Sequence, residues 1–134
     1  MTADSYRLEQ ISRFEELNPI TEKVIGGAYR VSNVLGPGFM EIVYDNALAY
    51  ELRKVGLSVK QQFPIPVFYD GVNVGEYVAD LLVEETVLVE LKAAKSLEAI
   101  HEAQCLNYLK ATGLRLCLLL NFGEPRVRIR RLAW

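Results

Sequence analysis

The chain has 134 residues, which is enough for one domain with a single substantial core. Hydrophobic residues make up 51% of it and charged residues 24%, a balance typical of a globular protein and not of a disordered one. The net charge of −2 is not that of a strongly basic nucleic-acid-binding protein. The longest apolar run, Leu116 to Leu120, is too short to cross a bilayer, and the N-terminus lacks the regions of a secretory signal. We therefore expect a cytoplasmic protein with no membrane partner.

Two helices are expected first. Residues 1–17 are polar and weakly periodic, which predicts a loosely attached N-terminal arm that could be helical. Asn18-Pro19 is a helix-start signal, so we expect the single domain, residues 18–134, to begin with a helix there. Gly36-Pro37-Gly38 ends that helix, and a second follows over residues 39–55 with Gly56 as its C-terminal cap.

The remaining elements alternate between strands and one further helix. Pro64 and Pro66 confine the first strand to a sheet edge, and Asp70-Gly71 predicts a tight hairpin turn. Ser96 is a candidate cap for the third helix. The predicted strands are 57–69, 72–83, 87–91, 114–120 and 126–134, with the helix at 96–112. The order is α, α, β, β, β, α, β, β, which indicates a mixed α/β fold.

The cysteines and the C-terminal arginines can each be interpreted as structural or as functional residues. Cys105 and Cys117 lie in apolar segments, and we expect two buried free thiols. Neither their spacing nor the single histidine suits zinc. Arg126, Arg128 and Arg130 alternate along the last strand and share one face. That face is either a solvated sheet edge or a strip that contacts phosphates, and both interpretations stay open.

Three charged residues interrupt two strands that are otherwise rich in Val, Leu and Ala. They are Asp80, Glu90 and Lys92. Buried charges are costly unless they are paired or bind a metal. A hard divalent ion takes carboxylate oxygens, waters and substrate phosphates, so Asp80, Glu90 and the Leu91 carbonyl could be ligands. Lys92 could activate a water or neutralise charge on a phosphate. A buried salt bridge between Lys92 and a carboxylate is the alternative.

The register of the hairpin tests this metal-site hypothesis. With a two-residue loop Val83 would pair with Thr86, and Asp80 and Glu90 would point to opposite faces because side chains alternate along a strand. A three-residue loop, residues 84–86, pairs Val83 with Val87 and places Asp80 opposite Glu90. The hypothesis therefore predicts an odd loop or a bulge.

The helices add polar side chains at helical spacing. Glu41 and Tyr44 share a face of the second helix, although an acid in a first turn also suits the helix dipole. His101, Gln104 and Tyr108 form a stripe on the third helix, which could bind phosphate, position the lysine or simply face water.

Taken in order, these motifs resemble the GxxExxY proteins, a small bacterial and archaeal family of the PD-(D/E)XK nuclease-like superfamily. The resemblance covers nearly the whole chain from about Thr21 onward. It rests on Gly38-x-x-Glu41-x-x-Tyr44, Asp80, Glu90-Leu91-Lys92 and His101-x-x-Gln104-x-x-x-Tyr108, with further similar stretches at 35–39, 107–113 and 121–123. Two positions depart from it. Ala79 precedes Asp80 where proline is common in the superfamily, and Ser32 stands where many relatives carry histidine.

The resemblance implies a restriction-endonuclease-like α-β-β-β-α-β core, with an extra N-terminal helix and a C-terminal strand. It implies a catalytic set of Glu41, Asp80, Glu90, Lys92, Gln104 and Tyr108. It also implies Mg²⁺ or Mn²⁺ held by Glu41, Asp80, Glu90 and the carbonyl of Leu91. Gln104 and Tyr108 match the QxxxY element of the RecB-like and lambda-exonuclease-like branch.

The implied function is metal-dependent hydrolysis of phosphodiester bonds in DNA. The superfamily favours DNA over RNA as the partner, and no residue singled out above recognises a 2′-hydroxyl. A homodimer would let so small a domain enclose duplex DNA. The alternative is a non-catalytic module that retains the nuclease fold and binds nucleic acid or another protein.

Overall fold

The computed structural model describes the backbone of residues 3–134 and the surroundings of side chains from residue 16 onward. Its elements are α1 (Ala3–Leu35), α2 (Glu41–Lys54), β1 (Val59–Tyr69), β2 (Val72–Val83), β3 (Val87–Lys92), α3 (Ala99–Thr112), β4 (Leu116–Asn121) and β5 (Arg128–Ala133). The strands form one sheet in the order β1-β2-β3-β4-β5. The predicted order of elements is confirmed.

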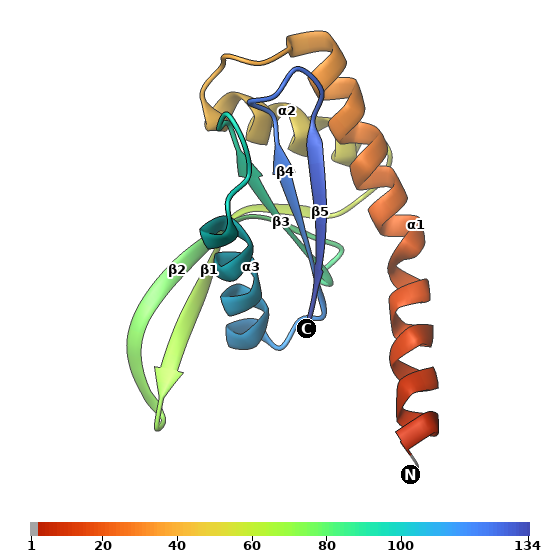
Figure 1. The fold of residues 1–134 in the computed structure, drawn as a ribbon, viewed down its shortest axis with the longest axis vertical. Coiled ribbons are helices and arrows are strands. Elements are labelled where there is room, and N and C mark those ends of the chain that lie inside the picture. The colour runs from red at the N-terminus through yellow and green to blue at the C-terminus, as the bar shows by residue number, and fades with distance from the viewer. Residues whose placement is uncertain (1–2) are drawn as a thin grey trace.

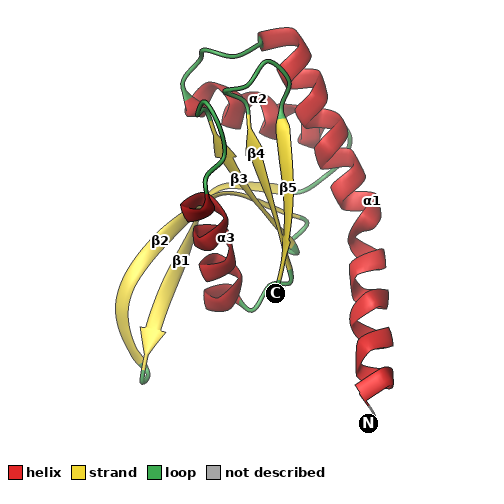
Figure 2. Cartoon of the chain, viewed as in Figure 1, coloured by secondary structure: helices red, strands yellow, loops and turns green. Residues whose placement is uncertain are grey.

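The sheet lies between two helical layers. Figure 1 shows α3 on one side of it and α1 with α2 on the other, and Figure 2 shows the strands as the middle layer. β3 and β4 are parallel and are joined through α3, whereas every other neighbouring pair is antiparallel. The run from α2 to β4 is therefore the expected α-β-β-β-α-β core, with α1 added before it and β5 after it.

The central strands are hydrophobic on both faces because both faces are covered. On β3, Val87, Val89 and Leu91 pack in a core with α1 and α2, whereas Leu88 packs in a second core with α3. Residues of β3 with even numbers therefore face α3. This alternation fixes the side of the sheet on which Glu90 and Lys92 lie.

The first helix differs from the prediction. α1 continues through Pro19 to Leu35, so Asn18-Pro19 does not start a helix, and the arm predicted for residues 1–17 is part of α1 from Ala3 onward. Residues 1 and 2 lie outside the described part. Proline has a backbone angle that suits a helix and removes only one hydrogen-bond donor. Beyond it, Val24, Ala28 and Val31 bury one face of α1 in the core, and this packing outweighs that loss.

The third helix also starts later than predicted. Its N-cap is Glu98 and not Ser96, and Glu98 forms a capping box with His101. The Glu98 N–H donates to His101 Nδ1 over 3.1 Å. His101 thus has a structural partner at the helix end that spacing alone does not reveal. At the other end Gly113 adopts a left-handed conformation, φ 75°, and confirms the predicted stop.

The predicted hairpin of β1 and β2 is confirmed, and β1 is an edge strand as Pro64 and Pro66 indicated. Its outer part bends away from the sheet beside α3 (Figure 1). A register shift between Val67 and Phe68 accompanies this outer part.

Cys105 and Cys117 are free and buried, as expected. Among the described residues, no helix is long and apolar enough to cross a membrane.

Gly123 gives a test of the packing at the end of β4. A Cβ at this position would clash with the backbone of Ala94, directly after β3. We expect Gly123→Ala to lower the free energy of unfolding by about 2 kcal/mol or more, because backbone cannot yield as a flexible side chain can. Urea denaturation measures this.

Gly26→Ala is the matched control. Gly26 lies inside α1 with nothing within 4 Å of the added Cβ, so alanine there should raise stability by up to about 1 kcal/mol. Equal effects of the two substitutions would contradict the proposed contact.

Candidate active site

The β2–β3 turn has the length that the metal-site hypothesis requires. Val83 pairs with Val87, Leu82 with Leu88 and Leu81 with Val89, so residues 84–86 form a three-residue loop. The prediction of an odd loop is confirmed. The same register places Asp80 opposite Glu90, and both lie on the face of the sheet that packs against α3.

The ladder between β2 and β3 ends at Leu81 and Val89, and the two carboxylates replace it. The Asp80 N–H donates to Glu90 Oε1 over 2.8 Å, and the Leu91 N–H donates to Asp80 Oδ2 over 2.8 Å. Buried backbone donors need partners, and these two donors find theirs in side chains where the strands part. Each carboxyl group uses one oxygen in this way. No other hydrogen bond of these two carboxyl groups is found among residues 16–134, so the second oxygen of each remains for a ligand.

Burial dominates the electrostatics of the pair. Desolvation and, after it, the Asp80 charge raise the pKa of Glu90 to about 8, against the hydrogen bond from the Asp80 amide. Desolvation likewise raises the pKa of Asp80 to about 6, against the hydrogen bond from Leu91. The positive charge near these two adjacent acids therefore does not compensate for their burial.

Lys92 lies on the same face but does not form the salt bridge that was the alternative. Among the ion pairs of residues 16–134, none joins Lys92 to Asp80 or Glu90. Its charge still lowers the pKa of both acids, but it is the fourth of five influences on Glu90 and the smallest of five on Asp80. A buried salt bridge therefore does not explain these three charged residues.

The turn after Lys92 is fixed by the end of β4. Asn121, fully buried and opposite Lys92 in the β3–β4 register, accepts from the Ala94 N–H over 3.0 Å and donates to the Ala94 carbonyl over 3.0 Å. The Phe122 N–H donates to the Lys92 carbonyl over 2.8 Å. With Gly123 packed against Ala94, these contacts hold the backbone from which Lys92 projects.

α3 covers the carboxylates with a polar pair. Gln104 Nε2 donates to the Tyr108 hydroxyl over 2.8 Å, as expected for side chains four residues apart on a helix. Tyr108 is buried, and burial raises its pKa, as do the charges of Glu90 and Asp80. The Tyr108 hydroxyl is thus a neutral donor close to the two acids.

The second helix contributes Glu41 from its first turn. The charge of Glu41 raises the pKa of Asp80 and of Glu90, so it lies within electrostatic reach of both acids. Tyr44 has a different role. Its hydroxyl donates to the Gly36 carbonyl over 2.7 Å and accepts from the Phe39 N–H over 3.0 Å. Tyr44 therefore holds the loop before α2, which in turn sets the position of Glu41.

A fourth acid near the site, Asp45, was not identified from the sequence. Asp45 is buried, accepts from Gln61 Nε2 over 2.6 Å and from Gln62 Nε2 over 3.4 Å, and its charge raises the pKa of Asp80. Burial raises the pKa of Asp45 itself. Its spacing of four from Glu41 was an available signal. The left-handed conformation of Gln62, φ 54°, was not readable from a strand-like sequence.

The donor set fits a divalent cation with few protein ligands. No three His, Cys, Asp or Glu side chains of the described residues form a ready metal cluster. Asp80 and Glu90 nevertheless offer one free oxygen each. The Leu91 N–H points toward β2, and its carbonyl points the same way, because the two groups of one strand residue lie on the same side. Two carboxylates with waters and phosphate oxygens are a usual Mg²⁺ environment.

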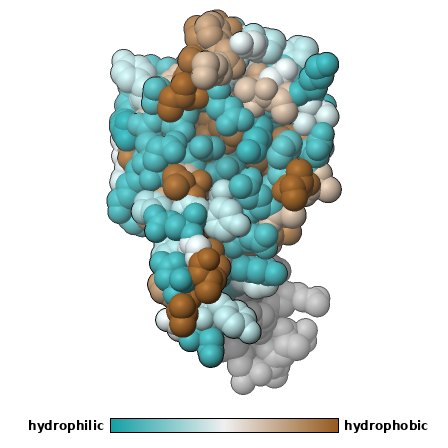
Figure 3. Space-filling model, turned by 90° about the vertical axis from the view of Figure 1, so that its left-hand side faces the viewer, coloured by the Kyte–Doolittle hydropathy of each residue, from teal (hydrophilic) through white to brown (hydrophobic). Residues whose placement is uncertain are grey.

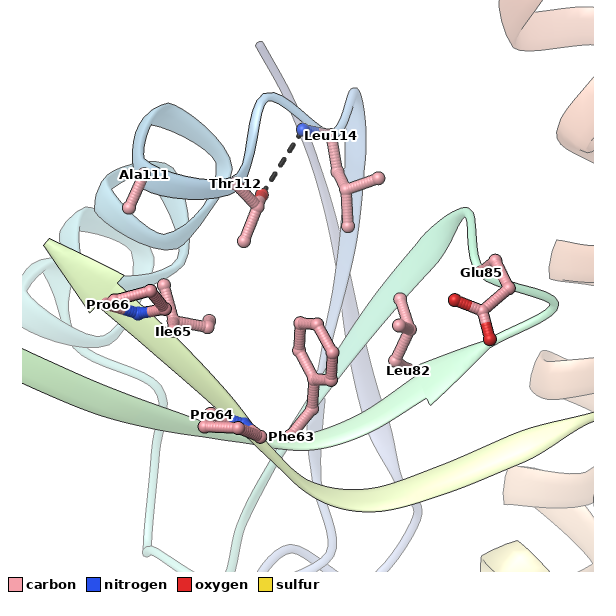
Figure 4. A pocket seen from close by; sticks show the side chains of 9 residues that line it. All are labelled: Phe63, Pro64, Ile65, Pro66, Leu82, Glu85, Ala111, Thr112 and Leu114. Atoms are coloured by element: carbon pink, nitrogen blue, oxygen red, sulfur yellow. Dashed lines mark hydrogen bonds between the residues drawn. The ribbon is translucent and has the colours of Figure 1, made fainter.

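A separate cavity does not belong to this site. It encloses about 250 Å³ between β1 and the C-terminal end of α3, and Figure 4 shows Phe63, Leu82 and Leu114 around it. Its only charged lining residue is Glu85. None of the predicted site residues lines it, so the carboxylate pair remains the candidate site.

Comparison with known proteins assigns the chain to a family. The sequence model of the PD-(D/E)XK nuclease superfamily matches residues 18–132, which include every residue described above as part of the site. No curated protein sequence matches the chain. Among solved structures, the chain is similar to an alkaline exonuclease from Laribacter hongkongensis, with 14% identity and a TM-score of 0.40, over 79% of this chain and 75% of the other. The family assignment rests on the sequence model alone.

The raised pKa values predict how stability depends on pH without metal. The folded-state pKa values, about 6 for Asp80 and about 8 for Glu90, exceed the ordinary 3.8 and 4.5. Their contribution to stability is fully present below about pH 4 and is lost as the pH rises through the folded-state values, on the order of a few kcal/mol. In EDTA, the urea midpoint should fall over this range.

Glu90→Gln, which stays neutral and keeps an acceptor for the Asp80 amide, should flatten the upper part of this profile. Glu51→Gln is the control, because Arg30 and Lys54 lower the pKa of Glu51 and remove it from this pH range. A Glu90→Gln profile parallel to that of the unaltered protein would show that Glu90 is not the titrating group.

Proposed function

Because the chain belongs to the PD-(D/E)XK nuclease superfamily, we propose that it is a divalent-metal-dependent nuclease that hydrolyses phosphodiester bonds in DNA. Nucleases of this superfamily are generally dependent on divalent metal ions. One observation carries the proposal. Asp80 and Glu90 lie side by side on a covered face of the sheet with no protein cation in ion-pair range among the described residues.

Within the superfamily, we assign the chain to the GxxExxY proteins. The structure supplies a physical reason for the motif that names them. Gly36 and Gly38 have positive φ angles of 66° and 112°, which lets the loop turn toward α2. Tyr44 holds that loop through two hydrogen bonds and stacks on Phe122, with ring centroids 4.8 Å apart. Glu41 is the one member of the motif left to act at the site.

In the proposed mechanism, Asp80, Glu90 and the Leu91 carbonyl would hold Mg²⁺ or Mn²⁺, and Glu41 would hold a second ion or a water. The ion would supply a Lewis acid for the phosphate and lower the pKa of a bound water. The carboxylates are oriented by the Leu91 and Asp80 amides, which fixes their free oxygens before any ligand binds. Such preorganisation reduces the rearrangement needed during the reaction.

Lys92 and the α3 pair have complementary roles in this proposal. Lys92 projects from a backbone fixed by Asn121 and supplies positive charge to the attacking water or to the phosphate. Gln104 positions the Tyr108 hydroxyl, which can donate to a phosphate oxygen. Together they place donors where negative charge develops on the phosphate oxygens.

Cleavage of labelled DNA with Mg²⁺ or Mn²⁺ tests the mechanism. We expect Asp80→Asn and Lys92→Ala each to lower the rate by about 100-fold or more, because each removes charge required in the transition state. Asparagine retains an oxygen that can accept from the Leu91 amide, so the fold should survive. Lys23→Ala, on an exposed face of α1, is the matched lysine control.

Cleavage that survives both site substitutions would refute the mechanism. Binding without cleavage by the unaltered protein, with every divalent metal tried, would instead identify a non-catalytic nucleic-acid-binding module.

Metal binding can be tested without any turnover. Calorimetric titration of the purified protein with Mn²⁺ should show one class of site, and Asp80→Asn or Glu90→Gln should weaken it by about 10-fold or more, since fewer charged ligands lower affinity. Glu102→Gln, at a half-buried acid of α3 that pairs with Arg130, should leave it unchanged. Equal Mn²⁺ affinity in all variants would place the ion elsewhere.

A further inference from the structure

A groove leads from the candidate site along α3 to the outer part of the β1–β2 hairpin. It consists of two hollows of about 270 and 450 Å³ that share Tyr77 and Asn107. The smaller hollow includes Gln104 and Tyr108 of the candidate site. The larger one continues past Tyr77 to Phe68 and Lys110. The two hollows therefore form one path that starts at the site.

Aromatic rings line this path without being buried in it. Tyr77 is 52% exposed and Phe68 is 61% exposed. The Tyr77 ring lies 5.8 Å from that of Tyr108, so the aromatic lining continues to the site. Figure 3 shows hydrophobic side chains gathered on the lower projection of the molecule, which is the outer part of the hairpin. A strand pair that exposes rings beside a polar helix offers flat faces to a ligand.

The charge of the groove differs from that of the whole chain. Among the described residues that line it, none is Asp or Glu. Lys110 supplies a positive charge, and Asn107 supplies an amide that can donate and accept hydrogen bonds. The chain as a whole carries a net charge of −2, but none of the described acids lines this path. An aromatic groove with a cation and no carboxylate suits an anionic ligand with flat rings.

We propose that this groove binds unpaired nucleic acid, whose bases stack on Tyr77 and Phe68 while Lys110 contacts the backbone. The inference rests on the proposed nuclease function and narrows its substrate to single-stranded DNA or an unpaired end. Base stacking on aromatic side chains needs an accessible base face, which a continuous duplex does not offer. Asn107 lies where it can bond to a base edge, and the strand leads on to Gln104 and Tyr108.

Binding can be measured apart from cleavage. Fluorescence anisotropy with a short labelled oligo(dT) strand in EDTA, which prevents metal-dependent cleavage, should show binding that Tyr77→Ala and Phe68→Ala each weaken by about 5- to 100-fold. Tyr69→Ala is the matched control, because this neighbouring ring is 74% exposed but does not line the groove. It should change the affinity less than about twofold.

A strand of the same length without bases separates stacking from attraction to phosphate. The unaltered protein should bind it about 5- to 100-fold more weakly than oligo(dT), and the double variant Tyr77→Ala/Phe68→Ala should bind both strands alike. A preference for duplex DNA, or equal affinity for the strands with and without bases, would overturn the proposal. So would a dimer, detected by sedimentation, that Phe68→Ala dissociates, since a second copy would then occupy the hairpin.

The outcomes for binding and cleavage are separable. Oligo(dT) binding that depends on Tyr77 and Phe68 without any cleavage would support the groove and refute the nuclease. Cleavage of single strands that Tyr77→Ala and Phe68→Ala leave unchanged, together with unchanged binding, would support the nuclease and refute the groove.

Discussion

The parting of β2 from β3 is the constraint on which the site depends. Up to Leu81 and Val89 the two strands are joined by backbone hydrogen bonds, and beyond them the carboxylates of Asp80 and Glu90 take over the free amides. An unsatisfied buried amide would cost about 1–3 kcal/mol, so the two acids are needed by the sheet itself. Where the two strands separate, the Leu91 carbonyl points into the opening, and the outer part of the β1–β2 hairpin bends away from the sheet beside α3. The carboxylate pair and the aromatic groove thus both depend on the separation of β2 from β3.

The other components reach the site from both helical layers. α3 lies directly over the acids and supplies Gln104 and Tyr108, whereas α2 packs on the opposite face and supplies Glu41 from its first turn. Tyr44 connects α2 to the end of β4 through Phe122, and Asn121 connects β4 to the backbone after Lys92. Residues far apart in the chain are therefore positioned by one continuous set of contacts.

The periodicity of the sequence predicted the element order, and Pro64 and Pro66 predicted the edge position of β1. The odd loop after Val83 was predicted by the metal-site hypothesis, because side-chain alternation brings Asp80 and Glu90 to one face only with an odd loop or a bulge. The errors have local causes too. Pro19 is tolerated within a packed helix, and Glu98 outcompetes Ser96 as a cap because His101 completes a capping box. Asp45 with Gln62 was missed because a left-handed residue within a strand has no signature in an alternating pattern. The groove was missed because it forms only where the outer part of the hairpin lies beside α3. That arrangement depends on tertiary contacts, which a local sequence pattern does not reveal.

Asp80 and Glu90 have a structural role in addition to their proposed catalytic one. Their presence in a relative therefore does not by itself indicate catalytic activity. A descendant that lost its catalytic activity would still need acceptors for the two amides at the parting of the strands, so selection for folding alone can retain both acids. Lys92 has no such backbone role among the described residues, since only its main chain is held by β4. If Lys92 has the proposed catalytic role, loss of this lysine while the two acids persist would distinguish inactive lineages from active ones in a set of relatives.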